Sequence, residues 1–193
     1  MERYKKNLDL LKKGNVYSKD MEHDACGVGL VASTEGKKSR AVVDYGIQAL
    51  KAVWHRGAVD AEGKTGDGAG IHLEIPKDFF IEKIEVTGHD YDNSEICVGM
   101  IFLPRNDYSS QESCKTIVES ELTKNDFSIY GWRQVPVNPK ILGEKAFQTM
   151  PEIIQVLFNS NDPNLLDKNL ERKIYEIRKR IENKAFDASL NNC

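Results

Sequence analysis

The stretch His23–Ala32, "HDACGVGLVA", places a cysteine at the start of a short apolar run. A polar leader of 25 residues, beginning "MERYKKNLDLLKKGN", precedes Cys26. The small apolar residues predict a buried strand over 26–33, in which Gly27 and Gly29 allow close backbone approach. Two interpretations of the cysteine are open. It is either a structural thiol, since free cysteine is among the most buried residue types, or a reactive group at the end of the leader.

The composition is that of an ordinary folded domain. A chain of 193 residues suits one domain, and 40% hydrophobic with 30% charged residues is typical of globular proteins. The net charge of −3 provides no electrostatic attraction for nucleic acid or an anionic membrane. No apolar run approaches the roughly 20 residues that span a bilayer, and the leader lacks the apolar core of a secretory signal. We therefore expect neither nucleic acid nor a membrane as a partner.

The cysteine pattern favours a reducing compartment. Four cysteines occur, at positions 26, 97, 114 and 193, without any C-x-x-C pair. Reduced thiols and a cytoplasmic location are the simpler expectation for such spacing.

Strands and helices alternate along the chain without a crossover fingerprint, which predicts an α+β fold or a layered α/β sandwich. Strands are expected at 71–75, 97–103, 127–135 and 153–158. Helices are expected from Ser39 to a cap at Gly57, from Pro76 through Phe80, after a capping box at Ser109 and Glu112, and over 166–181.

The reactive interpretation of Cys26 requires a base, because thiolate rather than thiol attacks carbonyl groups. At a pKa of about 8.5, only about 3% of a free thiol is ionised at pH 7. If residues 1–25 were removed, Cys26 would carry an α-amine with a pKa of about 7.7–8.0 that accepts the thiol proton. An intact Ala25–Cys26 peptide closes this route, so cleavage would activate the site. The chain then divides into a propeptide, 1–25, and a domain, 26–193.

Two further motifs flank a glycine-rich loop. His55-Arg-Gly-Ala58 is typical of a helix end, where positive charge suits the helix dipole. Thr65–Gly70, "TGDGAG", lacks the G-K-[ST] of a phosphate loop and precedes an expected strand rather than a helix. It is interpreted as a tight loop with glycine where backbones crowd.

Three other residues have structural interpretations. His72 alternates with Ile71 and Leu73 and is therefore expected at a strand surface or core edge. A metal site is not expected, because no second pair of residues has ligand spacing. Trp132 and Arg133, in "GWRQVP", are expected to pack and to form an ion pair at a strand end.

The sequence resembles the class-II glutamine amidotransferase region of bacterial glutamate synthase large (α) subunits. Three stretches carry the resemblance: "EHDACGVGLVA", "ALKAVWHRGAVDAEGKTGDGAGIHLEIPKDFF" and "IYGWRQVPVN". The resemblance extends from about Tyr17 to Lys184. It implies part of the αββα sandwich of the N-terminal-nucleophile hydrolases. It also implies an enzyme that hydrolyses glutamine through a γ-glutamyl thioester and passes the ammonia to 2-oxoglutarate in the parent enzyme.

The resemblance also assigns roles to residues. Cys26 would be the nucleophile with its α-amine as base after cleavage, and Arg56 and Gly57 would support the N-terminus. Glutamine, the remainder of the large subunit and a small NAD(P)H-oxidising subunit would be the partners. No cofactor or metal is expected in this chain; FMN and an iron–sulfur cluster are implied for other domains of the parent.

Two motifs of this family do not occur in the 193 residues: an Asn-Gly pair that supplies oxyanion donors, and the arginine of an H-x-R-Y-S-T segment. Loss of one oxyanion donor typically costs about 10²–10³ in rate. We therefore expect a truncated copy that is marginally stable and has little glutaminase activity in isolation. The alternative is a catalytically inactive fragment or interaction module with Cys26 as a structural thiol.

Overall fold

The computed structural model of the chain describes residues 27–53, 62–66, 68–92 and 94–190, together with Lys6, Leu10, Lys13 and Val59. The chain divides into two compact units. The first contains Met1–Val59 and Gly66–His72, and the second contains Asp60–Thr65 and Leu73–Cys193.

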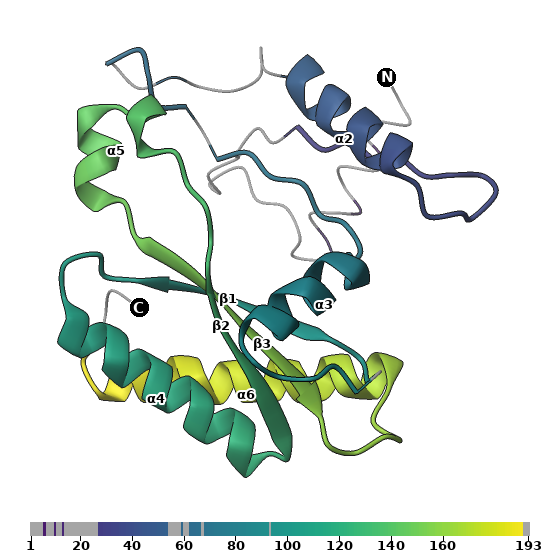
Figure 1. Cartoon of the computed structure of the whole chain (residues 1–193). Helices are drawn as coiled ribbons and strands as arrows, with labels where there is room; N and C mark the ends of the chain where they lie inside the picture. Colours follow the sequence, from purple (N-terminus) through teal and green to yellow (C-terminus); the bar gives the residue numbers. More distant parts are fainter. Residues whose placement is uncertain are drawn as a thin grey trace. The chain divides into compact units, whose positions relative to one another are not determined.

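Helix α2 (Arg40–Ala52) belongs to the first unit (Figure 1). The helix was expected from Ser39, which is its N-cap, and the expected apolar stripe is half-buried at Val43, Ile47 and Leu50. The helix ends at Ala52 with Val53 as C-cap, so the prediction that it continues to Gly57 is wrong.

Two predicted strands are wrong in the described residues. Residues 27–33 and 71–75 have no regular structure, and Val28 and Leu30 are each 91% exposed. A strand needs a neighbouring strand to satisfy its backbone N–H and C=O groups. No described segment pairs with either run, so the alternation of apolar residues alone does not produce a ladder.

The second unit is built on a three-stranded antiparallel sheet with the order β1-β3-β2. The strands are β1 (Cys97–Leu103), β2 (Phe127–Gln134) and β3 (Glu152–Ser160), which confirms three predicted strands (Figure 1). The central strand β3 is buried on both faces from 154 to 159.

Two helices cover one face of the sheet. Helix α4 (Tyr108–Lys124) lies beside α6 (Asp167–Asp187), as Figure 1 shows. Their side chains form one core with the strands, which comprises Cys97, Val118, Leu122, Phe127, Val156, Phe158, Leu170 and Ile177. Helix α6 confirms the predicted amphipathic helix.

The N-terminus of α4 differs from the prediction. Asp107 is the N-cap, and its carboxylate accepts a hydrogen bond from the Ser110 N–H at 3.0 Å. The predicted capping box at Ser109 and Glu112 is therefore wrong, because the aspartate two residues earlier supplies the strong N-cap acceptor.

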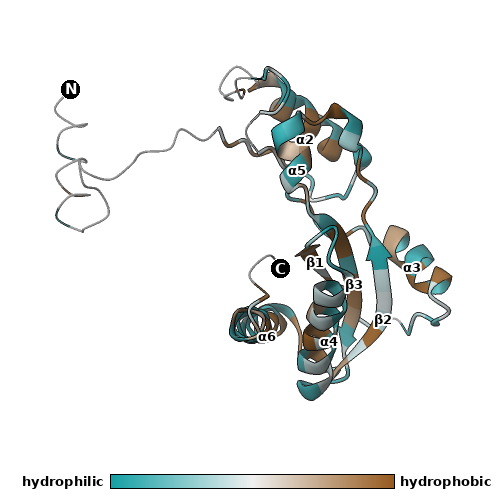
Figure 2. Cartoon of the chain, turned by 90° about the vertical axis from the view of Figure 1, so that its left-hand side faces the viewer, coloured by the Kyte–Doolittle hydropathy of each residue, from teal (hydrophilic) through white to brown (hydrophobic). Residues whose placement is uncertain are grey.

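Helix α3 (Lys77–Val86), which confirms the helix predicted after Pro76, packs on the opposite face of the sheet (Figure 2). Phe80 and Ile84 form a second core with Leu157. Met100 and Phe102 of β1 are 49% and 52% exposed. The described residues thus form one sheet with helices on both faces, which supports the α+β class.

A short connection joins β2 to β3. It contains a 3₁₀ turn, η2 (Pro139–Ile141), and helix α5 (Glu144–Thr149). None of the helices in the described part of the chain is long and apolar enough to cross a membrane.

A bulge at Gly131 changes the register of β2 against β3. Gly131 has a φ of 145°, and a Cβ there would lie 2.8 Å from Thr87 Cγ2. The Thr87 hydroxyl is also 2.7 Å from the Tyr130 carbonyl oxygen, to which it can donate. Glycine therefore allows β2 to approach the end of α3.

Gly131→Ala is expected to lower the free energy of unfolding by about 1–3 kcal/mol, because the backbone is strained and the new methyl group meets Thr87. Urea unfolding measures the loss. In a Thr87→Ser background, which removes Cγ2 and keeps the hydroxyl, the cost should be smaller. Equal costs in both backgrounds would rule out the methyl contact as a cause.

An ion pair ties α4 to α6. The Glu121 carboxylate, whose side chain is 5% exposed, bonds to Lys184 Nζ. Asn125 Nδ2 donates to the Glu121 carbonyl oxygen at 2.8 Å, and Arg180 Nη1 donates to Asn125 Oδ1 at 3.0 Å. The hydrogen bond from Lys184 is the main cause that lowers the pKa of Glu121.

Since the pKa of Glu121 is lowered by folding, its contribution to stability is complete above the pKa of the unfolded state and is lost as the pH falls through the folded value. Glu121→Gln is expected to cost about 1–3 kcal/mol at pH 7 and to weaken the acid dependence of unfolding below about pH 4.5. Glu112→Gln, which breaks the exposed pair with Lys115 on the same helix, is the matched control with little effect. An unchanged acid dependence in Glu121→Gln would contradict the assignment.

Candidate functional site

The predicted site residues Cys26, Arg56 and Gly57 lie outside the described residues. The structure describes the chain on either side of them: Gly27 follows the cysteine, and Val53 and Val59 flank the H-R-G-A motif.

The glycine-rich loop closes on itself between Val59 and Gly66, which form an isolated antiparallel bridge. Gly63, with a φ of 69°, lies in the turn between them, where a left-handed backbone favours glycine. Val59 is two residues beyond Gly57, and Gly66 belongs to the T-G-D-G-A-G motif. The bridge therefore closes the stretch that leads into the T-G-D-G-A-G motif.

Thr65 fixes this loop by two hydrogen bonds. Its hydroxyl donates to Glu62 Oε1 at 2.9 Å and accepts from the Gly143 N–H at 3.0 Å. Gly143 is the N-cap of α5. Because Thr65 and Gly143 are 78 positions apart, the sequence motifs provided no signal for this contact.

The described cysteines do not provide an alternative nucleophile. Cys97 is a free thiol with 5% exposure, and its burial, with the charges of Glu95 and Glu171, raises its pKa to about 12. The fraction of thiolate at neutral pH is therefore negligible. Cys114 is disulfide-bonded, so the expectation of reduced thiols is wrong for this residue.

Trp132 and Arg133 pack as predicted, but the predicted ion pair of Arg133 is wrong. Trp132 Nε1 donates to Glu119 Oε1 at 2.7 Å. Arg133 Nη1 donates to the neutral amide of Gln155 at 2.6 Å, and its guanidinium lies 5.1 Å from the centre of the Phe79 ring. An amide and an aromatic face take the place of the expected carboxylate.

His72, predicted at a strand surface, is exposed and lies outside any strand. Among the residues that the structure describes, no three His, Cys, Asp or Glu side chains are grouped so as to hold a metal ion.

A second cluster of polar groups joins the loop after α3 to the sheet. Tyr130 donates to Asp92 Oδ1 at 2.8 Å, and the Ser94 N–H donates to the same oxygen at 3.1 Å. Hydrogen bonds, first from Ser94 and then from Tyr130, lower the pKa of Asp92, while burial raises the pKa of Tyr130 to about 12. The Asp92 carboxylate is stabilised in its ionised form and the Tyr130 phenol keeps its proton, so their hydrogen bond has a structural role rather than an acid–base role.

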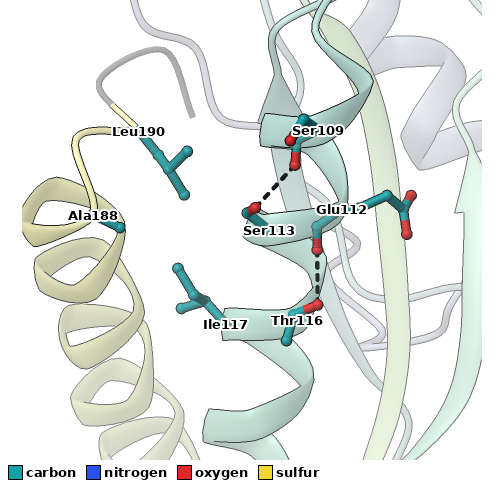
Figure 3. Close-up of a pocket in the computed structure, with 7 residues that line it drawn as sticks. All are labelled: Ser109, Glu112, Ser113, Thr116, Ile117, Ala188 and Leu190. Carbon is teal, nitrogen blue, oxygen red and sulfur yellow. Dashed lines mark hydrogen bonds between the residues drawn. The ribbon is translucent and has the colours of Figure 1, made fainter.

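A shallow groove lies between α4 and the end of α6 (Figure 3). Its lining residues are Ser109, Glu112, Ser113, Thr116, Ile117, Ala188 and Leu190. The Ser113 and Thr116 hydroxyls donate to carbonyl oxygens of their own helix, each at 2.9 Å. Their protons are therefore engaged, and none of the predicted site residues lines this groove.

Comparison with known proteins identifies relatives along nearly the whole chain. The sequence profile of the class-II glutamine amidotransferases matches residues 26–192. The chain is 48% identical over 189 residues to the glutamate synthase [NADPH] large chain of Azospirillum brasilense, which covers 98% of this chain and 12% of the relative.

Two eukaryotic relatives show the same pattern. Identity is 38% over 175 residues to ferredoxin-dependent glutamate synthase 2, chloroplastic, of Arabidopsis thaliana, covering 89% of this chain and 11% of the relative. The chain is also 35% identical over 196 residues to glutamate synthase [NADH] of Saccharomyces cerevisiae, and this match covers 93% of the chain and 9% of the relative. The chain thus spans about a tenth of the length of these relatives, and it belongs to the class-II glutamine amidotransferases.

Proposed function

We propose that this chain is the glutamine-hydrolysing part of a glutamate synthase, which releases ammonia from glutamine for addition to 2-oxoglutarate in the parent enzyme. The family match over 26–192, together with the three glutamate synthases named above, carries the proposal. The order of the C-G-V-G, H-R-G-A and T-G-D-G-A-G motifs supports it independently.

Cys26 is the proposed nucleophile, and residues 1–25 are the proposed propeptide. The family profile begins at residue 26, and the buried, unionised thiol of Cys97 is unsuited to the role. After cleavage, the α-amine of Cys26 takes the thiol proton as sulfur attacks the glutamine side-chain carbonyl carbon. The C–N bond then breaks, the amine returns the proton to the leaving ammonia, and water hydrolyses the thioester.

Arg56 and Gly57 are the proposed support of this terminus. A guanidinium near the sulfur favours the thiolate and disfavours protonation of the amine.

The finer architecture proposed for the chain is part of the αββα sandwich of N-terminal-nucleophile hydrolases. It requires a second sheet on the face of the first sheet opposite α4 and α6, beside the area that α3 covers. Met100 and Phe102, each about half exposed on that face, support the proposal, since apolar residues on a sheet face normally pack against another layer.

The parent enzyme supplies the remaining proposed partners: the rest of the large subunit, a small NAD(P)H-oxidising subunit, and FMN and an iron–sulfur cluster in other domains. The described cysteines of this chain do not fit an iron–sulfur cluster, because Cys97 is buried away from other ligands and Cys114 is disulfide-bonded. A cytoplasmic location is proposed, like the parent activity, from the similarity to glutamate synthases.

A non-catalytic interaction module, with Cys26 as a structural thiol, is the second candidate. The sequence contains neither an Asn-Gly pair nor an R-Y-S-T segment, which favours low activity of the 193 residues by themselves.

The two candidates differ in the N-terminus and the reactivity of Cys26. The enzyme requires a mature chain that begins at Cys26, which intact mass and N-terminal sequencing detect. Iodoacetamide at pH 7 should then modify Cys26 in the folded protein, whereas Cys97 should react only after unfolding in urea, since its pKa is about 12. Retention of a residue before Cys26 should lower glutaminase activity of the parent enzyme by about 10²–10⁴-fold, because the base is lost. A stable chain that retains Met1 and an unreactive Cys26 would favour the interaction module.

A further inference from the structure

We infer that the sheet face beside α3 binds a polypeptide segment that presents a carboxylate next to an apolar side chain. This acceptor face comprises Phe79, Lys83, Met100, Phe102, Arg133 and Gln155, all of which belong to the second unit. None of them is among the proposed catalytic residues, so the inference goes beyond the proposed glutaminase activity. In the proposed sandwich, the bound segment would be part of the second sheet.

One row of side chains crosses the acceptor face. Gln155 of β3 lies opposite Met100 of β1 and opposite Arg133 of β2. Side chains directly opposite one another in an antiparallel sheet share a face, and Phe102, two residues along β1, shares it as well. The Arg133 guanidinium lies 5.1 Å from the centre of the Phe79 ring, so this is the face on which α3 packs.

The apolar part of the acceptor face is exposed. Met100 and Phe102 are about half exposed and Phe79 is 38% exposed, whereas Leu157, which contacts α3 from the same sheet, is 0% exposed. Large apolar side chains grouped on one sheet face normally pack against another layer. The acceptor face therefore has the character of an interface.

The central polar group of the row is a donor without a protein acceptor. Arg133 Nη1 donates to Gln155 Oε1 at 2.6 Å, and because a guanidinium cannot accept, the orientation of the amide is fixed. Gln155 is 8% exposed, and its Nε2 has no acceptor among the residues that the structure describes. A layer that covers the face removes water from this amide, so the layer must supply an acceptor.

Two cations lie against the same aromatic ring. Lys83 Nζ is 5.2 Å and the Arg133 guanidinium 5.1 Å from the centre of the Phe79 ring. Within the described part of the chain, neither cation forms an ion pair with a carboxylate. The ring attracts both charges but accepts few of their N–H groups. An entirely apolar layer would remove water from the two cations without compensation, whereas a carboxylate supplies both the opposite charge and hydrogen-bond acceptors.

Two peptides that differ only in charge test the inference on the full 193-residue chain. The acidic probe is acetyl-LELE-amide, and the neutral probe is acetyl-LQLQ-amide. Titration is followed by NMR at the Met100 methyl group and the Arg133 Nε–H group. The acidic peptide should shift both signals and bind about 1.5- to 5-fold more tightly than the neutral peptide for each ion pair that it forms, the equilibrium factor of an exposed pair.

Charge variants locate the effect. Arg133→Gln and Lys83→Gln should each weaken binding of the acidic peptide by about 1.5- to 5-fold and leave the neutral peptide unaffected. Lys83→Gln removes no hydrogen bond within the described residues, so its result does not depend on the contact between Arg133 and Gln155. Lys168→Gln, which removes the same charge from α6 on the opposite face of the sheet, is the matched control.

Three results would overturn the inference. Equal affinity for the two peptides would show that the face has no preference for a carboxylate. Binding of either peptide without a shift at Met100 and Arg133, or no binding of either, would show that the face is not the site. An equal loss in Lys168→Gln would show a general attraction to positive charge. Each result would leave the glutaminase activity and the proposed sandwich intact, since neither depends on this preference.

Discussion

The burial of β3 between two edge strands is the constraint on which the rest of the second unit depends. Its residues from 154 to 159 are buried, its backbone pairs with β1 on one side and β2 on the other, and its side chains alternate between the two cores. Val156 and Phe158 face α4 and α6, whereas Leu157 faces α3. The helices can pack only because this strand supplies an apolar surface on each face.

The elements that the sequence predicts correctly are those whose apolar pattern is long and whose partners are close. β1, β3 and α6 are continuous runs or repeats that remain apolar whichever neighbour packs against them. The runs at 27–33 and 71–75 are also rich in apolar residues, but a strand requires a partner edge as well, which local sequence does not encode. The N-terminus of α4 shows a smaller failure of the same kind, since Asp107 and Ser109 are both good caps and geometry selects the aspartate.

The candidate site likewise has features that the sequence predicts and contacts that it does not. Motif order is sufficient to place the chain in its family, because each motif needs only a few adjacent residues. The link between Thr65 and Gly143 joins residues 78 positions apart and depends on a glycine that no motif contains. The amide partner of Arg133 was missed for the same reason, since Gln155 lies across the sheet on β3. Contacts of this kind follow from the fold and cannot be derived from spacing.

The ion pair between Glu121 and Lys184 has a consequence for how α6 is aligned along α4. Apolar side chains such as Leu170 and Ile177 would tolerate a slide of one helical turn, since hydrophobic contact has no direction. The Glu121 carboxylate would not tolerate this slide, because its side chain is 5% exposed and would lose its counter-ion Lys184. This buried ion pair therefore favours one alignment of the two helices over others of similar apolar burial, as a buried polar residue does in a coiled coil.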